Sequence, residues 1–371
     1  MSRFLLAQLR LESLIGKGSR EAIRTALQKL PTGPKTYDHA YKEAMERIEG
    51  QVINSRELAK QALSWITCAR RPLTTSELRH ALAVEVDKST LNKESLPEIR
   101  DIISMCAGLV TVDEKSQIIR LVHYTTQEYF DRTWTSWFPK AQIGITKVCV
   151  TYLLFEVFNT GFCPTDKEFK ARLQSSVLYD YAAQNWGYHA RTVSINEEQL
   201  ILRFLESEAK VSACSQAMVA SKTYSGDSQY VPRKITGLHL AAYFGLRDPI
   251  IALLKNGHNP DLKESYGRTP LSYAAERGHE EVVKLLLAKF RVNPDSKSNN
   301  ERTPLSYAAE RGHEAVVKLL LAKYRVNPNF RTRNGLTSLS WAVEGRNAGI
   351  VKLLLAKSKV NVFYLAVSKS D

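Results

Sequence analysis

The sequence predicts a mainly α-helical protein whose last third is a solenoid of stacked helix pairs. Segments 269–294 and 303–328 are near copies, offset by 34 residues, and they differ at only two positions, one of which holds Phe290 in the first copy and Tyr324 in the second. Weaker copies precede and follow this pair. A period of this length is typical of small helical units that cannot bury their apolar face alone and therefore stack. Helical periodicity also dominates the preceding residues.

Each copied residue has a place in a helix–turn–helix unit, as the copy that begins at Thr269 shows. Thr269 is expected to cap a helix whose first turn holds Pro270, where a missing N–H costs nothing. Ala274 is small enough for close helix packing, and Gly278 suits a left-handed helix end. Asn293 marks the start of a long loop. The shared apolar core is expected to come from one leucine pair in each of three repeats: Leu285, Leu286, Leu319, Leu320, Leu353 and Leu354.

These features together resemble the ankyrin repeat. That family usually has a His three residues after the capping Thr, and only His239 keeps it. The first repeat has Gly237 in place of the Pro, whereas the fourth has Ser338 for the Pro and Arg346 for the Gly. The resemblance implies an ankyrin-repeat α-solenoid over residues 223–371, with about four repeats, weaker end units and a poorly capped last repeat. It also implies a protein-binding surface.

Length and composition are those of a folded protein with two or three domains. Hydrophobic residues make up 44% and charged residues 24% of the 371 positions. The opening residues lack a secretory signal, and the longest apolar stretch, 148–158, is too short to span a bilayer. We expect an intracellular protein of the cytoplasm or nucleus, without membrane association. Its five cysteines are widely spaced, which indicates reduced thiols: Cys68, Cys106, Cys149, Cys163 and Cys214.

The net charge of +14 is concentrated in the repeats, because residues 229–371 hold 23 Lys and Arg against 12 Asp and Glu. Two rows of lysines recur once per repeat: Lys284, Lys318 and Lys352, and Lys289, Lys323 and Lys357. These rows form either a solvated face that keeps the array soluble or a docking surface for an acidic protein partner. A parallel row of Glu276, Glu310 and Glu344 makes the surface striped, which disfavours nucleic acid as the partner.

Residues 55–132 follow the order of a winged helix. A helix over 57–69 precedes a second helix with a capped start at Thr75, and a third helix is expected over 97–108. Two apolar strands, 109–112 and 117–122, then surround the polar turn DEKS and predict a small β-hairpin.

A second resemblance rests on two strings, AKQALSWITCARRPLTTSELRHALAV and LPEIRDIISMCAGLVTVDEKSQIIRLVHYTTQEYFDR. They resemble the winged-helix segment of fungal NACHT–ankyrin proteins, which are STAND or NOD-like signalling proteins. There the segment follows a nucleotide-binding NACHT module and precedes the repeats. The opening SRFLLAQLRLESL resembles the last helices of that module. Winged helices of this type are named after a GPI inositol deacylase, but the sequence has no G-x-S-x-G motif, so the name implies no such activity here.

The two resemblances divide the chain into four expected parts. Residues 1–53 are a helical remnant of a NACHT module, 54–135 the winged-helix domain, 136–222 a helical spacer and 223–371 the ankyrin repeats. The spacer is expected to be packed around four aromatic residues: Tyr179, Tyr181, Trp186 and Tyr188.

His123 is the one candidate nucleotide contact. In NACHT relatives the matching His contacts the nucleotide's β-phosphate and holds the inactive state, a role that the resemblance implies here only when a NACHT module is present. The sequence has no G-x-x-x-x-G-K-[ST] phosphate loop, and Gly16-Lys17-Gly18-Ser19 has the wrong spacing. The alternative for His123 is a local hydrogen bond at a strand end.

The sequence therefore predicts the interaction and regulatory portion of a NACHT-type signalling switch. The array would bind a protein partner, and the winged helix would couple to a NACHT module in cis or in trans. We expect no catalytic residues, no metal site and no cofactor. One alternative is a nucleotide hydrolase that uses the residual NACHT helices, which the missing phosphate loop opposes. The other is a basic nucleic-acid-binding adaptor, which the mostly apolar helix at 98–107 and the acidic turn of the hairpin oppose.

Overall fold

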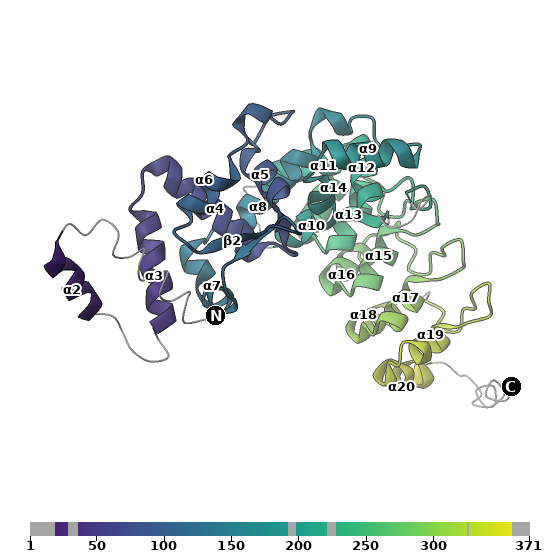
Figure 1. Cartoon of the computed structure of the whole chain (residues 1–371). Helices are drawn as coiled ribbons and strands as arrows, with labels where there is room; N and C mark the ends of the chain where they lie inside the picture. The colour runs from purple at the N-terminus through teal and green to yellow at the C-terminus, as the bar shows by residue number, and fades with distance from the viewer. Residues whose placement is uncertain (1–18, 29–35, 192–197, 221–227, 325, 358–371) are drawn as a thin grey trace. The chain divides into compact units, whose positions relative to one another are not determined.

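The computed structural model describes residues 19–28, 36–191, 198–220, 228–324 and 326–357 (Figure 1). The chain separates into two compact units. The first comprises residues 1–156 and 172–192, and the second comprises 157–171 and 193–371. The start of the expected NACHT remnant, at 1–18, and the end of the expected repeat array, at 358–371, lie outside the described residues.

The first unit contains the winged helix and the helices around it. Its elements in chain order are α2 (Arg20–Gln28), α3 (Thr36–Glu49), α4 (Ile53–Cys68), β1 (Leu73–Thr74), α5 (Thr75–Ala83), η1 (Lys93–Ser95), α6 (Ile99–Met105), β2 (Val110–Asp113), β3 (Ile118–Leu121), α7 (Tyr124–Trp137), α8 (Ala141–Leu153) and α10 (Tyr179–Ala190). Helix α4 contacts α5, α6, α7 and α8, so its buried Leu63 and Trp65 lie at the centre of the core. Helices α8 and α10 pack together.

The sheet has three strands rather than the two that the sequence predicted. Strand β3 lies between β1 and β2 and is antiparallel to both, with Ile119 opposite Leu73 on one side and Val112 on the other. Ile119 is buried and the neighbouring Arg120 is exposed, as the two-residue period of a half-buried strand requires. Strand β1 has two residues, which is too short to produce a periodic signal in the sequence.

The N-cap of α5 lies one residue before the predicted cap at Thr75. The cap is Thr74, whose side chain accepts from the backbone N–H of Glu77 while the Glu77 carboxylate accepts from that of Thr74. Thr75 is instead the first helical residue, and its N–H donates to the carbonyl of Gln117 at 2.8 Å. The pairing of β1 with β3 keeps the chain extended up to Thr74, which fixes where the helix begins.

The aromatic residues of the expected spacer are mostly core. Tyr179, Tyr181 and Trp186 are fully buried. Tyr188 is half-buried instead, with the guanidinium carbons of Arg70 and Arg191 4.9 Å and 5.1 Å from its ring centroid. The prediction is therefore correct for three of the four residues.

The second unit is an array of helix pairs. Its elements are α11 (Glu198–Leu205), α12 (Glu208–Val219), α13 (Gly237–Phe244), α14 (Arg247–Lys255), α15 (Pro270–Arg277), α16 (Glu280–Leu287), α17 (Pro304–Arg311), α18 (Glu314–Leu321), α19 (Ser338–Glu344) and α20 (Ala348–Lys357). Two short helices, η2 (Glu156–Phe158) and α9 (Asp166–Ser175), lie where the chain passes between the units. Within the array, the first helices of successive repeats contact one another, as do the second helices (Figure 1). This is the stacking that the ankyrin resemblance implied.

An additional helix pair, α11 and α12, packs on the first repeat. Both helices contact α13, and α11 also contacts α14. This contact explains Gly237, which stands where the middle repeats have Pro, because a Cβ there would lie 2.1 Å from the carbonyl oxygen of Leu205 at the end of α11. The departure from the repeat pattern is therefore a requirement of close packing rather than a sign of decay.

The helix ends of the middle repeats are those predicted. Thr269 and Thr303 cap their helices by accepting from Ser272 and Ser306, and Gly278 closes the first of these helices in the left-handed conformation. Ser272 occupies the position where the family has His, and its hydroxyl accepts from the N–H of Thr269 just as the His239 ring accepts from Thr236. A shorter side chain therefore closes the same capping box.

Candidate functional site

His123 caps helix α7 immediately after the strand β3. Its Nδ1 accepts from the backbone N–H of Thr125 at 3.3 Å and lies 2.8 Å from the Thr125 hydroxyl, which lies 2.6 Å from the hydroxyl of Tyr41. A ring nitrogen that accepts from a backbone N–H carries no proton, so the imidazole proton is on Nε2. The half-buried ring can therefore present one N–H donor while its other nitrogen holds the helix start.

The first lysine row is not electrostatically uniform. The ammonium of Lys284 lies 2.7 Å from Glu280 and 2.9 Å from Glu281, and that of Lys318 lies 2.6 Å from Glu314. Hydrogen bonds to these two glutamates raise the pKa of Lys284. Ala348 stands where the other two repeats have Glu280 and Glu314, so Lys352 lacks the equivalent partner. Its charge is therefore the least compensated of the row.

The second row lies at the helix ends. Lys289 and Lys323 are in the turns that follow α16 and α18, and Lys357 is the last residue of α20. All three are exposed, and none forms an ion pair within the described part of the chain. Cations at helix C-termini complement the helix dipole, so these positions are favourable without a carboxylate.

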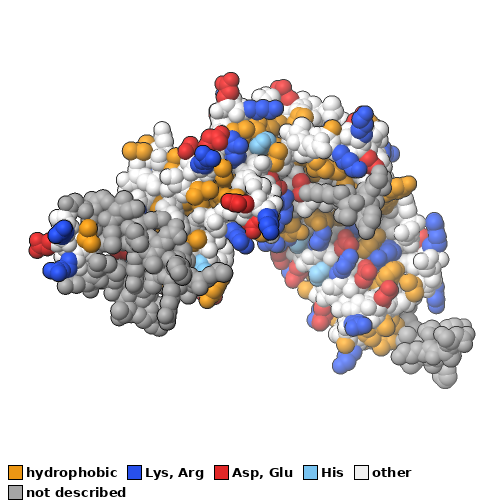
Figure 2. Space-filling model, viewed as in Figure 1, with side chains coloured by type: hydrophobic (Ala, Val, Ile, Leu, Met, Phe, Trp, Pro, Cys, Tyr) orange, Lys and Arg blue, Asp and Glu red, His pale blue; other side chains and the backbone are white. Residues whose placement is uncertain are grey.

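Two members of the acidic row are bound inside the array rather than displayed on its surface. Glu276 pairs with Arg268, and the Glu310 carboxylate lies 2.5 Å from the Arg302 guanidinium. Glu344, in contrast, is exposed. The array shows blue and red side chains side by side over the repeats in Figure 2. Its surface is therefore mixed in charge, and less of the acidic charge is exposed than the sequence suggested.

The two paired arginines belong to an alternating stack with aromatic rings. The guanidinium carbon of Arg268 lies 4.0 Å from the ring centroid of Tyr273 and 4.5 Å from that of Tyr307. The carbon of Arg302 lies 4.1 Å from the Tyr307 ring and 3.9 Å from that of Trp341. Burial lowers the pKa of Arg268, but the charge and hydrogen bond of Glu276 together with Tyr273 and Tyr307 outweigh burial and leave the pKa raised. We call this set the arginine–aromatic stack: Tyr273, Arg268, Tyr307, Arg302 and Trp341.

Sequence reasoning missed the arginine–aromatic stack, although its signal is present. An Arg precedes the capping Thr in both near copies, and a Tyr follows it five residues later. Each ring lies against an Arg of its own or the neighbouring repeat, so the pattern becomes visible only when the repeats are stacked. The stack joins successive repeats together.

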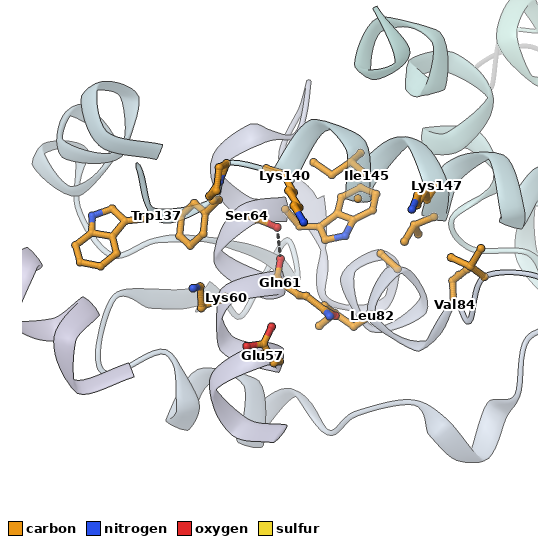
Figure 3. A pocket seen from close by; sticks show the side chains of 18 residues that line it. Glu57, Lys60, Gln61, Ser64, Leu82, Val84, Trp137, Lys140, Ile145 and Lys147 are labelled. Atoms are coloured by element: carbon orange, nitrogen blue, oxygen red, sulfur yellow. Dashed lines mark hydrogen bonds between the residues drawn. The ribbon is translucent and has the colours of Figure 1, made fainter. Parts of the chain in front are cut away.

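The first unit has a cavity of about 460 Å³ between α4, the end of α5 and the corner from α7 to α8 (Figure 3). Trp65, Trp137 and Ile145 form much of its wall. Its polar groups include Lys60, whose ammonium lies 2.6 Å from Glu49, and Lys140. Neither His nor Cys is among its described lining residues. An apolar hollow with lysines around it can accept an apolar side chain.

A second cavity, of about 360 Å³, lies between α12 and the first two repeats. Tyr273 and Arg268, at the beginning of the arginine–aromatic stack, form part of its wall together with His239. Burial lowers the pKa of His239 to about 4, and the ring's Nε2 donates to the carbonyl of Arg268 at 3.2 Å. His239 is therefore a neutral structural group.

Over the described residues, no cluster of His, Cys, Asp and Glu could hold a metal ion. None of the helices in this part of the chain combines the length and the apolarity that crossing a membrane requires.

Two family models match the chain. The ankyrin-repeat model matches residues 238–331 and 290–364, and the model of the GPI inositol-deacylase winged helix domain matches residues 45–157. The chain therefore contains an ankyrin-repeat array and a winged-helix domain of this type, as the sequence predicted. Ankyrin repeats indicate a role in protein–protein interaction.

Two curated proteins share short segments with the array. A putative ankyrin repeat protein YahD of Escherichia coli (strain K12) is 53% identical over 36 residues, which are 10% of this chain and 18% of that protein. A cyclin-dependent kinase 4 inhibitor B of Bos taurus is 39% identical over 51 residues, which are 14% of this chain and 39% of that protein. The chain thus spans about a fifth and two fifths of the length of these relatives.

Proposed function

We propose that this chain is the interaction and regulatory portion of a NACHT-type signalling switch and is not itself an enzyme. The observation that carries the proposal is the presence in one chain of a winged helix at 45–157 and an ankyrin array from residue 238 onward. The winged helix would couple to a nucleotide-binding module, in cis or in trans, and the array would bind a protein partner. The name of the bovine relative, an inhibitor of a kinase, supports an ankyrin array that acts by binding protein.

His123 is the residue through which we propose that the winged helix senses nucleotide. Its Nδ1 is used by the helix cap, so its Nε2–H remains to donate to a phosphate oxygen of a nucleotide held by a NACHT module. The position at the start of α7 adds a second favourable term, because the positive end of the helix dipole attracts a phosphate.

The test is ADP retention by this chain fused to a NACHT module from a protein of the same domain order. His123→Ala removes both the cap and the donor, whereas His123→Asn keeps a good cap and is too short to reach the phosphate. We expect both variants to release ADP faster than the parent, by about tenfold for the loss of one hydrogen bond to a charged group. Equal release by His123→Asn and the parent would remove the phosphate contact, since that variant's helix remains capped.

The lysine rows are the surface on which we propose that an acidic partner docks. Lys352 and the helix-end lysines carry the least compensated charge, so they should contribute more to steering than Lys284 and Lys318. Changing Lys352 and Lys357 to Glu should lower the association rate of a partner captured with the wild-type chain and flatten its salt dependence. The matched change of Lys284 and Lys318 should have a smaller effect. Equal association rates for all three proteins would leave the lysines as a solvated face.

A further inference from the structure

Two aromatic side chains in the array are fully exposed at equivalent places. Phe290 and Tyr324 are 104% and 100% exposed, the highest values among the large hydrophobic residues that the structure describes. Each is the second residue of a hydrogen-bonded turn. The carbonyl of Lys289 accepts from the N–H of Val292 at 3.1 Å, and that of Lys323 accepts from Val326 at 3.2 Å. Turn tips usually carry Gly, Asn, Asp, Ser or Pro, so a ring at this place in two successive repeats is unusual.

The fold does not require these rings. The first repeat joins its second helix to its loop with one residue fewer, through the ordinary turn pair Asn256 and Gly257. Gly257 has a φ of 85°, and space is open around it. The same connection is therefore made without an aromatic residue. The longer turn of the second and third repeats places a ring in solvent, and the packing of the array gains nothing from it.

Positive charge surrounds the two rings. Lys289 and Lys323 precede them, and Arg291 follows Phe290. All three cations are exposed, and within the described residues none has a carboxylate partner. We call this surface the aromatic–basic edge: Lys289, Phe290, Arg291, Lys323 and Tyr324.

We propose that the aromatic–basic edge binds an acidic, extended segment of a partner protein. Two apolar side chains of the segment would pack on Phe290 and Tyr324, and its carboxylates would meet Lys289, Arg291 and Lys323. Exposed aromatic residues are the type of side chain that dominates the energy of protein interfaces, and cations beside them select the acidic partner. The inference rests on the proposed protein-binding role of the array and names the chemistry of that partner.

The helix ends favour a protein segment over a nucleic acid. The turns follow the C-termini of α16 and α18, where the last carbonyls of each helix and the negative end of its dipole lie. A peptide backbone brings N–H donors to these carbonyls. A phosphate backbone brings only negative charge and acceptors, which this end of a helix repels.

The test uses a random copolymer of glutamate and tyrosine as the acidic, aromatic probe, and polyglutamate as the probe with charge alone. The whole chain should bind the copolymer more tightly than polyglutamate. In the double variant Phe290→Ser/Tyr324→Ser, affinity for the copolymer should fall about tenfold, while affinity for polyglutamate should change by less than about twofold. Tyr230→Ser is the matched control, since Tyr230 is 81% exposed in the same unit and should leave both affinities unchanged.

Three results would overturn the proposal. The wild-type chain could bind the two polymers equally, or the double variant could keep the wild-type preference for the copolymer. In the third, single-stranded oligothymidylate could bind more tightly than the copolymer and lose affinity in the double variant, which would make the edge a nucleic-acid surface. The variant's unfolding midpoint should equal that of the wild type, because both positions are outside the core.

The outcome is separable from that of the proposed function. If the captured partner still depends on Lys352 and Lys357 while the copolymer preference is absent, the inference about the edge is wrong and the docking role of the array remains. If the copolymer preference is present and the His123 variants retain ADP like the parent, the edge is supported and the coupling to a nucleotide-binding module is wrong.

Discussion

In the third and fourth repeats, different residues adopt the same left-handed backbone conformation after the first helix. The third repeat closes its first helix with Gly312 at a φ of 81°, and the fourth holds Arg346 at the equivalent place at a φ of 57°. An L-residue in this conformation costs about 1–2 kcal/mol, which glycine avoids. Bonds to the preceding repeat are nevertheless kept. Nε2 of His313 lies 2.9 Å from the carbonyl oxygen of Glu276, and the Asn347 amide donates to that of Glu310 at 2.9 Å. The backbone conformation and the contacts between repeats are therefore preserved where the residue types are not.

The largest expected effect lies in the arginine–aromatic stack. Tyr307 lies between two guanidinium groups, so Tyr307→Ala removes a buried ring and both of its cation contacts. We expect a loss of about 3–5 kcal/mol in the free energy of unfolding of the second unit. Tyr307→Phe keeps the ring and should lose less than about 1 kcal/mol. Urea unfolding followed by circular dichroism measures both. A small loss for the alanine variant would show that the stack is incidental.

The next largest effect is a pH dependence of stability that His239 gives to the first repeat and that Ser272 does not give to the second. His239 must stay neutral to accept from Thr236, and burial lowers its pKa to about 4, whereas Ser272 closes the same cap without titrating. A lowered folded-state pKa means that stability is complete above the unfolded value of about 6.5 and declines as the pH falls towards 4. The expected decline is about 3 kcal/mol. His239→Ser should remove this part of the pH dependence, as measured by urea unfolding at pH 7.5 and at pH 4.5. An unchanged slope in the variant would assign the dependence to other groups.

A smaller loss of stability is expected when the third repeat receives the residue that follows the first helix in the fourth repeat. Gly312→Arg places a side chain where the φ is 81° and where a Cβ would lie 2.8 Å from the Asn347 oxygen. We expect a loss of about 2–3 kcal/mol from the combination of backbone strain and the clash. Thermal unfolding would show this as a lowered midpoint. A neutral result would mean that the backbone at this position adjusts freely.

The smallest effect is the reverse exchange. Arg346→Gly relieves the strained φ but adds freedom to the unfolded chain, so the net gain should be about 0.5–1 kcal/mol. The same thermal measurement should show a raised midpoint. A lowered midpoint would show that the Arg346 side chain makes a favourable contact that outweighs its backbone strain.

Features that depend on residues adjacent in the sequence could be predicted. Features that depend on how one repeat packs on the next could not. Thr269 as a cap and Gly278 as a helix end follow from local backbone chemistry. The packing of Gly237 against Leu205 requires knowledge that α11 lies on the first repeat, and the pairing of Arg268 with Tyr307 crosses from one repeat to the next.

The candidate site was predicted in part. His123 could be singled out by its resemblance to a known His, but its role as a cap depends on where α7 begins. The lysine rows could be predicted from the 34-residue offset. Whether a lysine has a carboxylate partner depends instead on the residue one helical turn before it, as the pair Lys318–Glu314 and the lack of that partner at Lys352 show. The exposure of Phe290 and Tyr324 had no sequence signal, because an aromatic residue is normally expected in a core.

Calorimetric titration of ADP and ATP tests the central claim most directly. The chain alone should show no micromolar binding and no hydrolysis. When a separately produced NACHT module is added, the chain should bind it and slow its release of ADP in a manner that depends on His123. Micromolar binding of nucleotide by the chain alone, or its hydrolysis, would contradict the account and favour an enzyme.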